Sequence, residues 1–305
     1  MTKYLVFGGA GFLGSHLVDK LLENTSNKVV VYDNLYRGTL KNLAHHCYNS
    51  NLEFVHGDIR DYNKITEYIR GSSIVYHLAA QSNVVGSTLD SAYTEETNIL
   101  GTANIAMACK NFGVSQLIFT SSREVYGNNI GAKEHDELNP SNLYGHTKFK
   151  GECIIRDFLN NTDVVCKTLR LSNVYGSRDF GRVIPLWIKE FKKDNGKITI
   201  YGGKQIIDFV HVSIVVKAFL KASETNLLGQ TINIGSGKGT TLQELHDKMY
   251  LLFGNKSVEL EVLPKRDFET QNYVANIDRM KSLLGIYPNE DPLHGLEKMI
   301  KGDKV

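Results

Sequence analysis

Tyr144 and Lys148 are the residues of this sequence best suited to acid–base chemistry. They lie four positions apart, so a helix would present both side chains on one face. A neighbouring ammonium group stabilises phenolate and lowers the pKa of a tyrosine, which can then take a proton from a substrate hydroxyl. Of the fifteen tyrosines, only Tyr144 has a lysine four positions later. We therefore predict a catalytic pair, although a chance pair on the surface has the same spacing.

Ser122 and Glu124 are two further candidate catalytic residues. Ser122 ends the run 117–122, a predicted strand whose carboxyl end would face the ligand crevice of an open α/β sheet. Its hydroxyl can hydrogen-bond the reacting oxygen. If the strand continues in extended form, Glu124 points to the same side and brings a carboxylate to the substrate. The alternatives are that Ser122 caps a loop and that Glu124 pairs with an arginine or lysine.

A glycine-rich turn near the N-terminus predicts a dinucleotide site. Gly8, Gly11 and Gly14 follow the apolar run 3–7 and open a predicted helix. Glycines here permit a tight turn and close approach of the backbone to a pyrophosphate. The first amides of the helix, at Phe12 and Leu13, would face the phosphates. Such a turn can also bind nothing, so the motif needs support from other residues.

Asp33 supplies that support. It follows Gly14 by 19 residues, at the end of the second predicted strand, where a carboxylate accepts hydrogen bonds from ribose hydroxyls. The same charge would repel the 2′-phosphate of NADP, so NAD is the predicted cofactor. Arg37 lies near enough in the sequence to receive a phosphate, which leaves NADP as an alternative.

Strand–helix alternation predicts the fold that positions these residues. Short β-branched runs alternate with helix-period segments, which indicates an α/β fold with a Rossmann-type, doubly wound parallel sheet. A smaller C-terminal α/β lobe would bind the substrate. We place the cofactor domain at 1–173 plus 206–235 and the substrate lobe at 174–205 plus 236–305. The predicted sheet strands are 3–7, 29–32, 52–55, 74–77, 117–120, 164–169 and 231–234, and the substrate lobe should contain a helix near 185–193 and a strand near 198–201.

Composition excludes several other classes of protein. The 305 residues are 42% hydrophobic and 22% charged with a net charge of +2, so the chain lacks the cationic surplus of a nucleic-acid-binding protein. The four cysteines are widely spaced, without a C-x-x-C pair or histidines at metal-ligand spacing, which predicts reduced thiols, no metal and a cytoplasmic location. The first strand begins too early for a signal peptide, and no apolar run approaches the roughly 20 residues of a membrane span.

Several motifs in one order resemble the extended short-chain dehydrogenase/reductase family, in its nucleotide-sugar epimerase and dehydratase branch of UDP-glucose 4-epimerase-like enzymes. The resemblance covers nearly the whole chain. Beyond the glycine turn, the motifs are Asp33-Asn34-Leu35, Gly57-Asp58-Ile59-Arg60-Asp61, His77-Leu78-Ala79-Ala80, Asn98-x-x-Gly101-Thr102, Tyr144-x-x-x-Lys148 and Arg170-x-x-Asn173-x-Tyr175-Gly176. The resemblance implies that Asp58 contacts adenine and that the NAD site also includes Asn34, Ile59, Leu78, Ala79, Ala80, Asn98, Tyr144 and Lys148.

The same resemblance implies a nucleotide-diphosphate sugar as the substrate. Cationic side chains would bind its diphosphate, and a loop rich in glycine and arginine would close over the sugar. The chain departs from the family at Ile207, where an arginine normally meets the phosphate, and Lys204 could compensate. Arginines in exposed loops are also often only solvated. The predicted substrate contacts are Ser122, Asn173, Arg178, Arg182, Lys204 and Arg266.

The leading hypothesis is an NDP-sugar 4-epimerase, which oxidises the C4 hydroxyl to a transient ketone and returns hydride to its other face. The alternative is a 4,6-dehydratase or related enzyme in which Glu124 removes the C5 proton. Arg123 stands where those enzymes carry an aspartate, and a guanidinium is a poor proton donor.

Two further alternatives are weaker. A uronate decarboxylase tends to use an arginine in the region of Ile207, and a non-catalytic NAD-binding protein would not need Tyr144, Lys148 and Ser122 together. The family also implies a homodimer formed through helices near 88–112 and 143–160.

Overall fold

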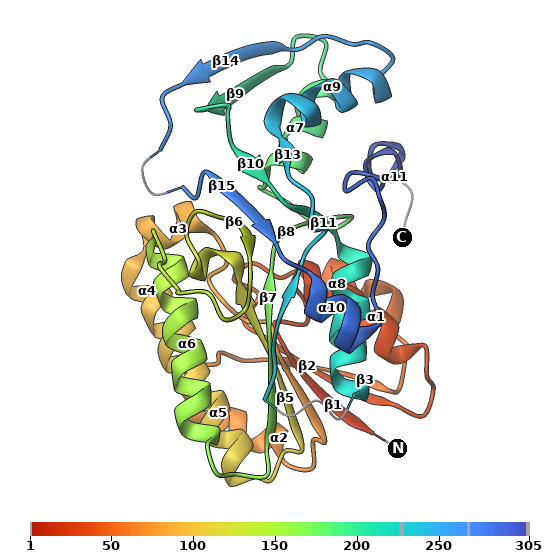
Figure 1. Ribbon diagram of the computed structural model, residues 1–305. Helices are drawn as coiled ribbons and strands as arrows, with labels where there is room; N and C mark the ends of the chain where they lie inside the picture. Colours follow the sequence, from red (N-terminus) through yellow and green to blue (C-terminus); the bar gives the residue numbers. More distant parts are fainter. Residues whose placement is uncertain (1, 226–228, 267–268, 303–305) are drawn as a thin grey trace.

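A parallel sheet of seven strands forms the centre of the larger lobe (Figure 1). The computed structural model describes residues 2–225, 229–266 and 269–302. In spatial order the strands are β12 (Thr231–Ile234), β7 (Val165–Leu171), β5 (Gln116–Ser122), β4 (Ile74–His77), β1 (Lys3–Phe7), β2 (Lys28–Asp33) and β3 (Leu52–His56), and every neighbouring pair is parallel. The strand order reverses beside β1, as in a doubly wound sheet, so the predicted fold class is confirmed.

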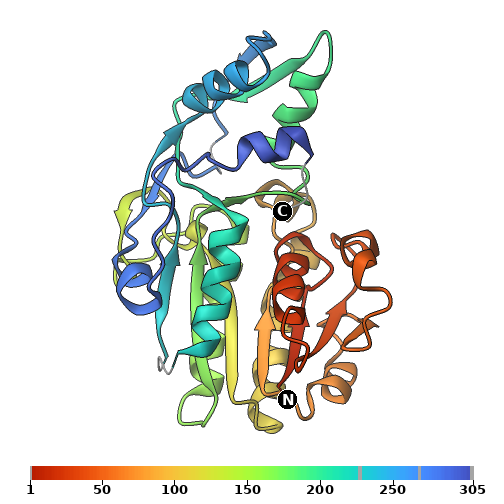
Figure 2. The ribbon, with the colours of Figure 1, turned by 90° about the vertical axis from the view of Figure 1, so that its right-hand side faces the viewer.

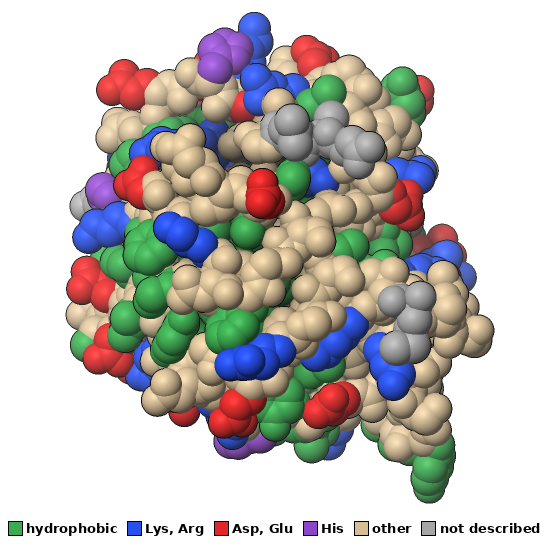
Figure 3. Space-filling model, turned by 90° about the horizontal axis from the view of Figure 1, so that it is seen from below, with side chains coloured by type: hydrophobic (Ala, Val, Ile, Leu, Met, Phe, Trp, Pro, Cys, Tyr) green, Lys and Arg blue, Asp and Glu red, His purple; other side chains and the backbone are tan. Residues whose placement is uncertain are grey.

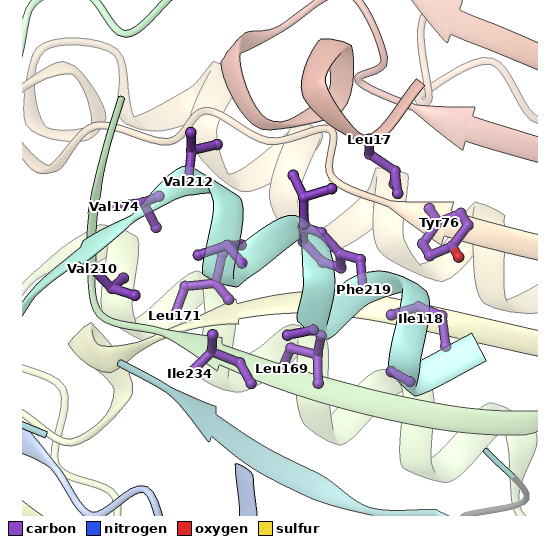
Figure 4. Close-up of a cluster of buried hydrophobic side chains, with 14 of the residues drawn as sticks. Leu17, Tyr76, Ile118, Leu169, Leu171, Val174, Val210, Val212, Phe219 and Ile234 are labelled. Atoms are coloured by element: carbon purple, nitrogen blue, oxygen red, sulfur yellow. The ribbon is translucent and has the colours of Figure 1, made fainter. Parts of the chain in front are cut away.

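Helices cover both faces of this sheet (Figure 1). One face packs against α1 (Phe12–Leu22), α8 (Val212–Glu224) and α10 (Asp278–Leu284), and the other against α2 (Tyr62–Ile69), α5 (Gly101–Asn111) and α6 (Leu143–Leu159). Figure 4 shows the first of these cores, where Leu17 and Phe219 from the helices meet Tyr76, Ile118 and Leu169 from the strands. Side chains alternate along each strand, so the two cores share the same strands.

The smaller lobe lies above the carboxyl edge of the large sheet (Figures 1 and 2). Helices α7 (Val183–Lys192), α9 (Leu242–Leu252) and α11 (Leu296–Lys301) share its apolar core. Its sheets are β13 (Thr240–Thr241), β10 (Ile206–Ile207), β15 (Asn272–Ala275) and β6 (Asn129–Ala132); β11 (Phe209–His211) with β8 (Asn173–Tyr175); and β14 (Glu259–Leu263) with β9 (Lys197–Tyr201). The predicted domain boundaries stay a prediction, and several elements cross them. Strands β10 and β11, from the range 206–235, lie in sheets of the smaller lobe, β6 pairs with β15, and α10 packs on α8 and β12.

The long helix predicted near 88–112 is present from Ser91 to Asn111, with a π-helical segment inside it and a break from a short helix just before it. Helices α3 (Val84–Leu89) and α4 (Ser91–Glu95) precede a π-helix, η2 (Glu96–Leu100), which leads directly into α5. The break occurs at Asp90, whose side chain accepts a hydrogen bond from the Tyr93 backbone N–H at 3.1 Å and so begins a new helix. Helix α5 packs on α6 within one chain. A homodimer through these helices stays a prediction.

The surface carries both signs of charge. Figure 3 shows Lys and Arg side chains interspersed with Asp and Glu on the face seen from below. Over residues 2–225, 229–266 and 269–302, no helix combines the length and apolar character that a membrane crossing requires.

Candidate active site

A cavity of about 590 Å³ lies between the carboxyl edge of the large sheet and the smaller lobe. This volume suits a small-molecule site. The cavity wall includes most of the predicted site residues: Gly8, Gly11, Phe12, Leu13, Gly14, Asp33, Asn34, Ile59, Leu78, Ala79, Ala80, Ser122, Glu124, Tyr144, Lys148, Asn173, Arg182 and Arg266. The other predicted residues, Asp58, Asn98, Arg178 and Lys204, lie outside this wall.

The glycine turn fits a dinucleotide phosphate. Gly8 has a positive φ of 81°, and a Cβ added at Gly14 would lie 2.1 Å from the Gly8 carbonyl oxygen, so the strand and helix approach as closely as the motif requires. Gly11 is the N-cap residue of α1, and no side chain caps this end of the helix. The first amides of α1 therefore remain available for an anion in the cavity.

Asp33 ends β2 with its carboxylate already oriented. Its Oδ2 accepts a hydrogen bond from the Ala10 amide at 3.0 Å, and its Oδ1 accepts one from the Leu35 amide at 2.8 Å. Burial raises the pKa of Asp33, and these two hydrogen bonds oppose that effect. The remaining lone pairs face the cavity, where ribose hydroxyls can donate to them.

Asp58 and Asn98 support the site from behind. Asp58 accepts a hydrogen bond from the Asn34 side chain at 2.9 Å and pairs with Arg60, also at 2.9 Å. Burial would raise the pKa of Asp58, but the hydrogen bonds from Arg60 outweigh it and lower the pKa. Asn98 is buried and donates to Thr147 at 3.0 Å. Both side chains bind protein groups, and the contact of Asp58 with adenine stays a prediction.

Helix α6 positions Tyr144 and Lys148. Asn142 caps the helix by accepting a hydrogen bond from the Gly145 amide at 2.9 Å. Lys148 Nζ donates to the Thr120 carbonyl at 2.9 Å and lies 6.0 Å from the centre of the Tyr144 ring. The two side chains therefore share one face of α6, as the spacing predicted, and both reach the cavity.

Burial shifts both pKa values toward the neutral forms. It raises the pKa of Tyr144 to about 12, against the opposing effects of Arg182 and of a hydrogen bond with Ser122. It lowers the pKa of Lys148 to about 7, with Glu152 opposing. Arg182 and Arg37 are cationic groups whose charge lowers the Tyr144 pKa against this burial, and the expectation that Lys148 does so together with a bound nicotinamide stays a prediction.

Ser122 is the last residue of β5, and the expected continuation of the strand through Glu124 is wrong. The 3₁₀ helix η3 (Arg123–Val125) begins there because the Ser122 hydroxyl accepts a hydrogen bond from the Glu124 amide at 3.2 Å. Glu124 nevertheless reaches the cavity wall. This approach depends on Gly145, since a Cβ there would lie 2.5 Å from the Glu124 carbonyl oxygen.

The Glu124 carboxylate is almost fully buried and has three donors. Arg123 binds Oε1 at 2.7 Å, while Asn142 and Thr270 donate to Oε2 at 2.8 and 2.7 Å. The Arg123 guanidinium also lies 5.7 Å from the centre of the Tyr273 ring. The salt bridge that the sequence analysis gave as an alternative is present, and Glu124 also lies on the cavity wall.

The smaller lobe contributes two cationic side chains to the wall. Arg266 stacks over the Tyr201 ring at 3.5 Å and pairs with Glu269 at 2.9 Å. Arg182 pairs with Asp179 at 3.0 Å, and burial raises the pKa of Asp179 to about 6 against the effect of Arg182. Arg178 instead pairs with Asp19 outside the cavity, at 2.8 Å.

Five buried polar atoms on this wall have no hydrogen-bond partner within the described part of the chain. They are Thr97 Oγ1, Thr120 Oγ1, Asn173 Nδ2, Asp179 Oδ2 and Gln205 Oε1. Buried polar groups are rarely left unpaired, so these atoms indicate a polar ligand. The sequence predicted only Asn173 among them. Gln205 lies beside the noted departure at Ile207, Asp179 lies between the predicted Arg178 and Arg182, and Thr97 directly precedes the predicted Asn98, so neighbouring positions pointed to all three.

Comparisons with known proteins agree with this geometry. Residues 4–235 match the model of the NAD dependent epimerase/dehydratase family. The chain belongs to this family. Its members are NAD-dependent enzymes of nucleotide-sugar chemistry, so the predicted family, enzymatic character and NAD cofactor are confirmed.

Relatives of this family member carry out different reactions. It is 35% identical to a "Putative UDP-glucose 4-epimerase" of Methanocaldococcus jannaschii, over 97% of this chain and 96% of the relative. It is 30% identical to "UDP-glucuronic acid decarboxylase 3" of Arabidopsis thaliana, over 97% of this chain and 87% of the relative. The structure of DesIV, a dTDP-glucose 4,6-dehydratase from Streptomyces venezuelae with NAD bound, superposes with a TM-score of 0.92, 27% identity and coverage of 98% and 96%. Likeness alone therefore leaves the reaction open among these three classes.

Proposed function

We propose that this family member is an NAD-dependent nucleotide-sugar 4-epimerase. The observation that carries this proposal is the environment of Glu124. Both alternatives, dehydration and decarboxylation, would depend on groups beside the sugar ring beyond those that exchange hydride and proton at C4. In this chain the carboxylate best placed for such a role is bound by Arg123, Asn142 and Thr270.

Dehydration needs a base for the C5 proton and an acid for the departing hydroxyl. Three donors already occupy the Glu124 carboxylate, so a substrate proton could reach only the one lone-pair site that they leave on Oε1. Arg123 occupies the position of the acid, and a guanidinium does not release its proton at working pH. Arg123 thus leaves the site without the acid and engages the carboxylate that would serve as the base.

Epimerisation at C4 needs fewer groups, and they lie together in the cavity. The Tyr144 hydroxyl can take the proton of the sugar hydroxyl as it is oxidised and return it on reduction. Ser122 hydrogen-bonds Tyr144 and can hold the same sugar oxygen. NAD, when bound on the glycine turn, supplies the hydride acceptor. Arg182 and Arg266 are placed to hold the diphosphate while the sugar turns over.

Uronate decarboxylation is less well supported. Ile207 lies on the cavity wall as an apolar side chain, in a region where those enzymes tend to use an arginine. Arg182 is the nearby cation, and Asp179 already binds it at 3.0 Å.

Turnover in deuterated water tests the proposal. The protein with NAD is incubated with UDP-glucose, UDP-glucuronic acid and dTDP-glucose, and the products are examined by NMR and mass spectrometry. We expect a C4 epimer of at least one sugar, without deuterium at C5 and without loss of water or carbon dioxide. Deuterium at C5 together with loss of water would instead establish a dehydratase.

Tyr144→Phe provides the matched variant. Because this change removes only the hydroxyl, epimerisation should fall by at least about 100-fold, the range of a general acid–base contribution. NAD binding, measured by calorimetry, should remain. Unchanged turnover in this variant would refute the assigned role of Tyr144.

A further inference from the structure

Two consecutive histidines and an aspartate converge on the surface, apart from the active-site cavity. Asp19 lies on α1, and His45 and His46 end the 3₁₀ helix η1 (Leu40–His46). The Nε2 atoms of His45 and His46 lie 2.7 and 2.9 Å from the same oxygen, Asp19 Oδ1. In the described part of the chain, no other three His, Cys, Asp or Glu side chains bring their ligand atoms so close together.

The arrangement differs from a pair of one histidine with one carboxylate. One carboxylate oxygen receives both imidazoles, and the two rings lie with their centres only 4.1 Å apart. Each ring must carry its proton on Nε2 to donate, so the two N–H groups use both lone pairs of one oxygen. A cation at the meeting point would replace both protons and bind the three atoms at once.

We propose that Asp19, His45 and His46 bind a divalent metal ion of the zinc type. Zinc binds imidazole nitrogen and carboxylate oxygen at about 2.0–2.2 Å in tetrahedral geometry, so two of its ligand atoms lie about 3.4 Å apart. The three ligand atoms here all lie within 4.8 Å of one another, and small side-chain rotations reach that geometry. Two nitrogens and one oxygen favour Zn²⁺ over Mg²⁺ or Ca²⁺, which prefer oxygen alone.

The second carboxylate oxygen has its own partner. Arg178 Nη2 binds Asp19 Oδ2 at 2.8 Å, on the opposite side of the carboxylate from the imidazoles. This contact keeps Oδ1 directed at the histidines and leaves Asp19 as a ligand through one oxygen. The carboxylate lies between the guanidinium and the metal position, which offsets the repulsion between the two cations.

The exposure of the three side chains and the elements that they join suit a structural metal ion with water among its ligands. The His45 side chain is 45% exposed, so water can complete the coordination. Through Asp19 and Arg178, the ion would join α1, η1 and the segment before α7 that also carries Asp179 and Arg182 on the cavity wall. Bound metal should therefore raise the melting temperature of the protein.

Calorimetry on the full chain, free of affinity tags, tests the proposal directly. We expect one Zn²⁺ per chain, an absorption spectrum of tetrahedral Co²⁺ when cobalt is used, and no binding of Mg²⁺. His45→Gln and His46→Gln should each weaken zinc binding by at least about tenfold, since loss of even a supporting group around a metal has effects of that size.

Two control variants distinguish this site from others. His246→Gln removes a histidine that pairs with a single carboxylate, Asp247, and Cys47→Ser removes an exposed thiol close in sequence. Both should bind zinc as the unchanged protein does. Absence of stoichiometric zinc binding would overturn the proposal. So would zinc binding by His45→Gln or His46→Gln as tight as that of the unchanged protein, or loss of zinc binding in Cys47→Ser. None of these outcomes depends on the proposed epimerase activity.

Discussion

Replacing Arg123 with methionine should destabilise the protein because it leaves the Glu124 carboxylate without its cationic partner. The side chains of Arg123 and Glu124 are only 13% and 6% exposed and meet at 2.7 Å. Removing one partner of a buried ion pair costs about 3–5 kcal/mol in free energy of unfolding. Glu124 keeps its hydrogen bonds to Asn142 and Thr270, so we expect the lower end, about 3 kcal/mol.

The double variant Arg123→Met/Glu124→Gln separates loss of charge balance from loss of packing. Glutamine has nearly the shape of glutamate, and its carbonyl oxygen can still accept from Asn142 and Thr270. The double variant should therefore recover most of the loss and lie within about 1 kcal/mol of the unchanged protein. The coupling between the two changes should be about 2 kcal/mol or more.

Urea denaturation at pH 7 measures these differences in the free energy of unfolding. The dependence of this free energy on urea concentration is compared among the variants. Arg156→Met is the matched control, because Arg156 and Asp157 are 72% and 70% exposed at 3.5 Å and such pairs contribute at most about 1 kcal/mol. A loss below about 1 kcal/mol for Arg123→Met, or a double variant no more stable than the single one, would refute the view that Arg123 balances Glu124. It would also weaken the argument against dehydration.

Two other predictions concern the cofactor-binding lobe. Without cofactor, the unfolded chain keeps the Lys148 proton up to the ordinary pKa of 10.5 and the folded chain only up to about 7. The free energy of unfolding should therefore rise by up to about 1.4 kcal/mol per pH unit across this window. Lys148→Met should abolish that rise in urea titrations, and an unchanged pH profile would show that Lys148 titrates normally. Gly14→Ala should weaken NAD binding by calorimetry at least about tenfold, because the new Cβ would lie 2.1 Å from the Gly8 carbonyl oxygen and would block the approach to the pyrophosphate. Equal affinity in a variant with an unchanged circular dichroism spectrum would contradict the role of this glycine.

Local sequence determined the parts of the molecule that depend on near neighbours. The glycine turn, Asp33 at the end of β2 and the Tyr144–Lys148 pair on α6 all appear in the structure where spacing placed them. Their geometry follows from backbone freedom and helix periodicity, which a short stretch of residues encodes by itself. The strands of the large sheet were predictable for the same reason, to within a few residues at their ends.

Only the tertiary structure decided how distant groups combine. Thr270 lies 146 residues from Glu124, yet its hydroxyl donates to the carboxylate. Asn98 and Asp58 carry family motifs, and the folded chain joins them to Thr147 and to Asn34 and Arg60. Burial moves the pKa values of Tyr144 and Lys148 toward the neutral forms, opposite to what two isolated neighbours would do.

The same distinction applies to the reaction and to the proposed metal site. The sequence determined the fold class, the NAD cofactor and the candidate acid–base pair. The engagement of Glu124 and the meeting of Asp19 with His45 and His46 required the folded chain, since Asp19 and His45 are 26 positions apart on different helices. Hydrogen bonding, desolvation and charge pairing act over a few ångströms in space, and the folded chain alone determines which residues lie within that range.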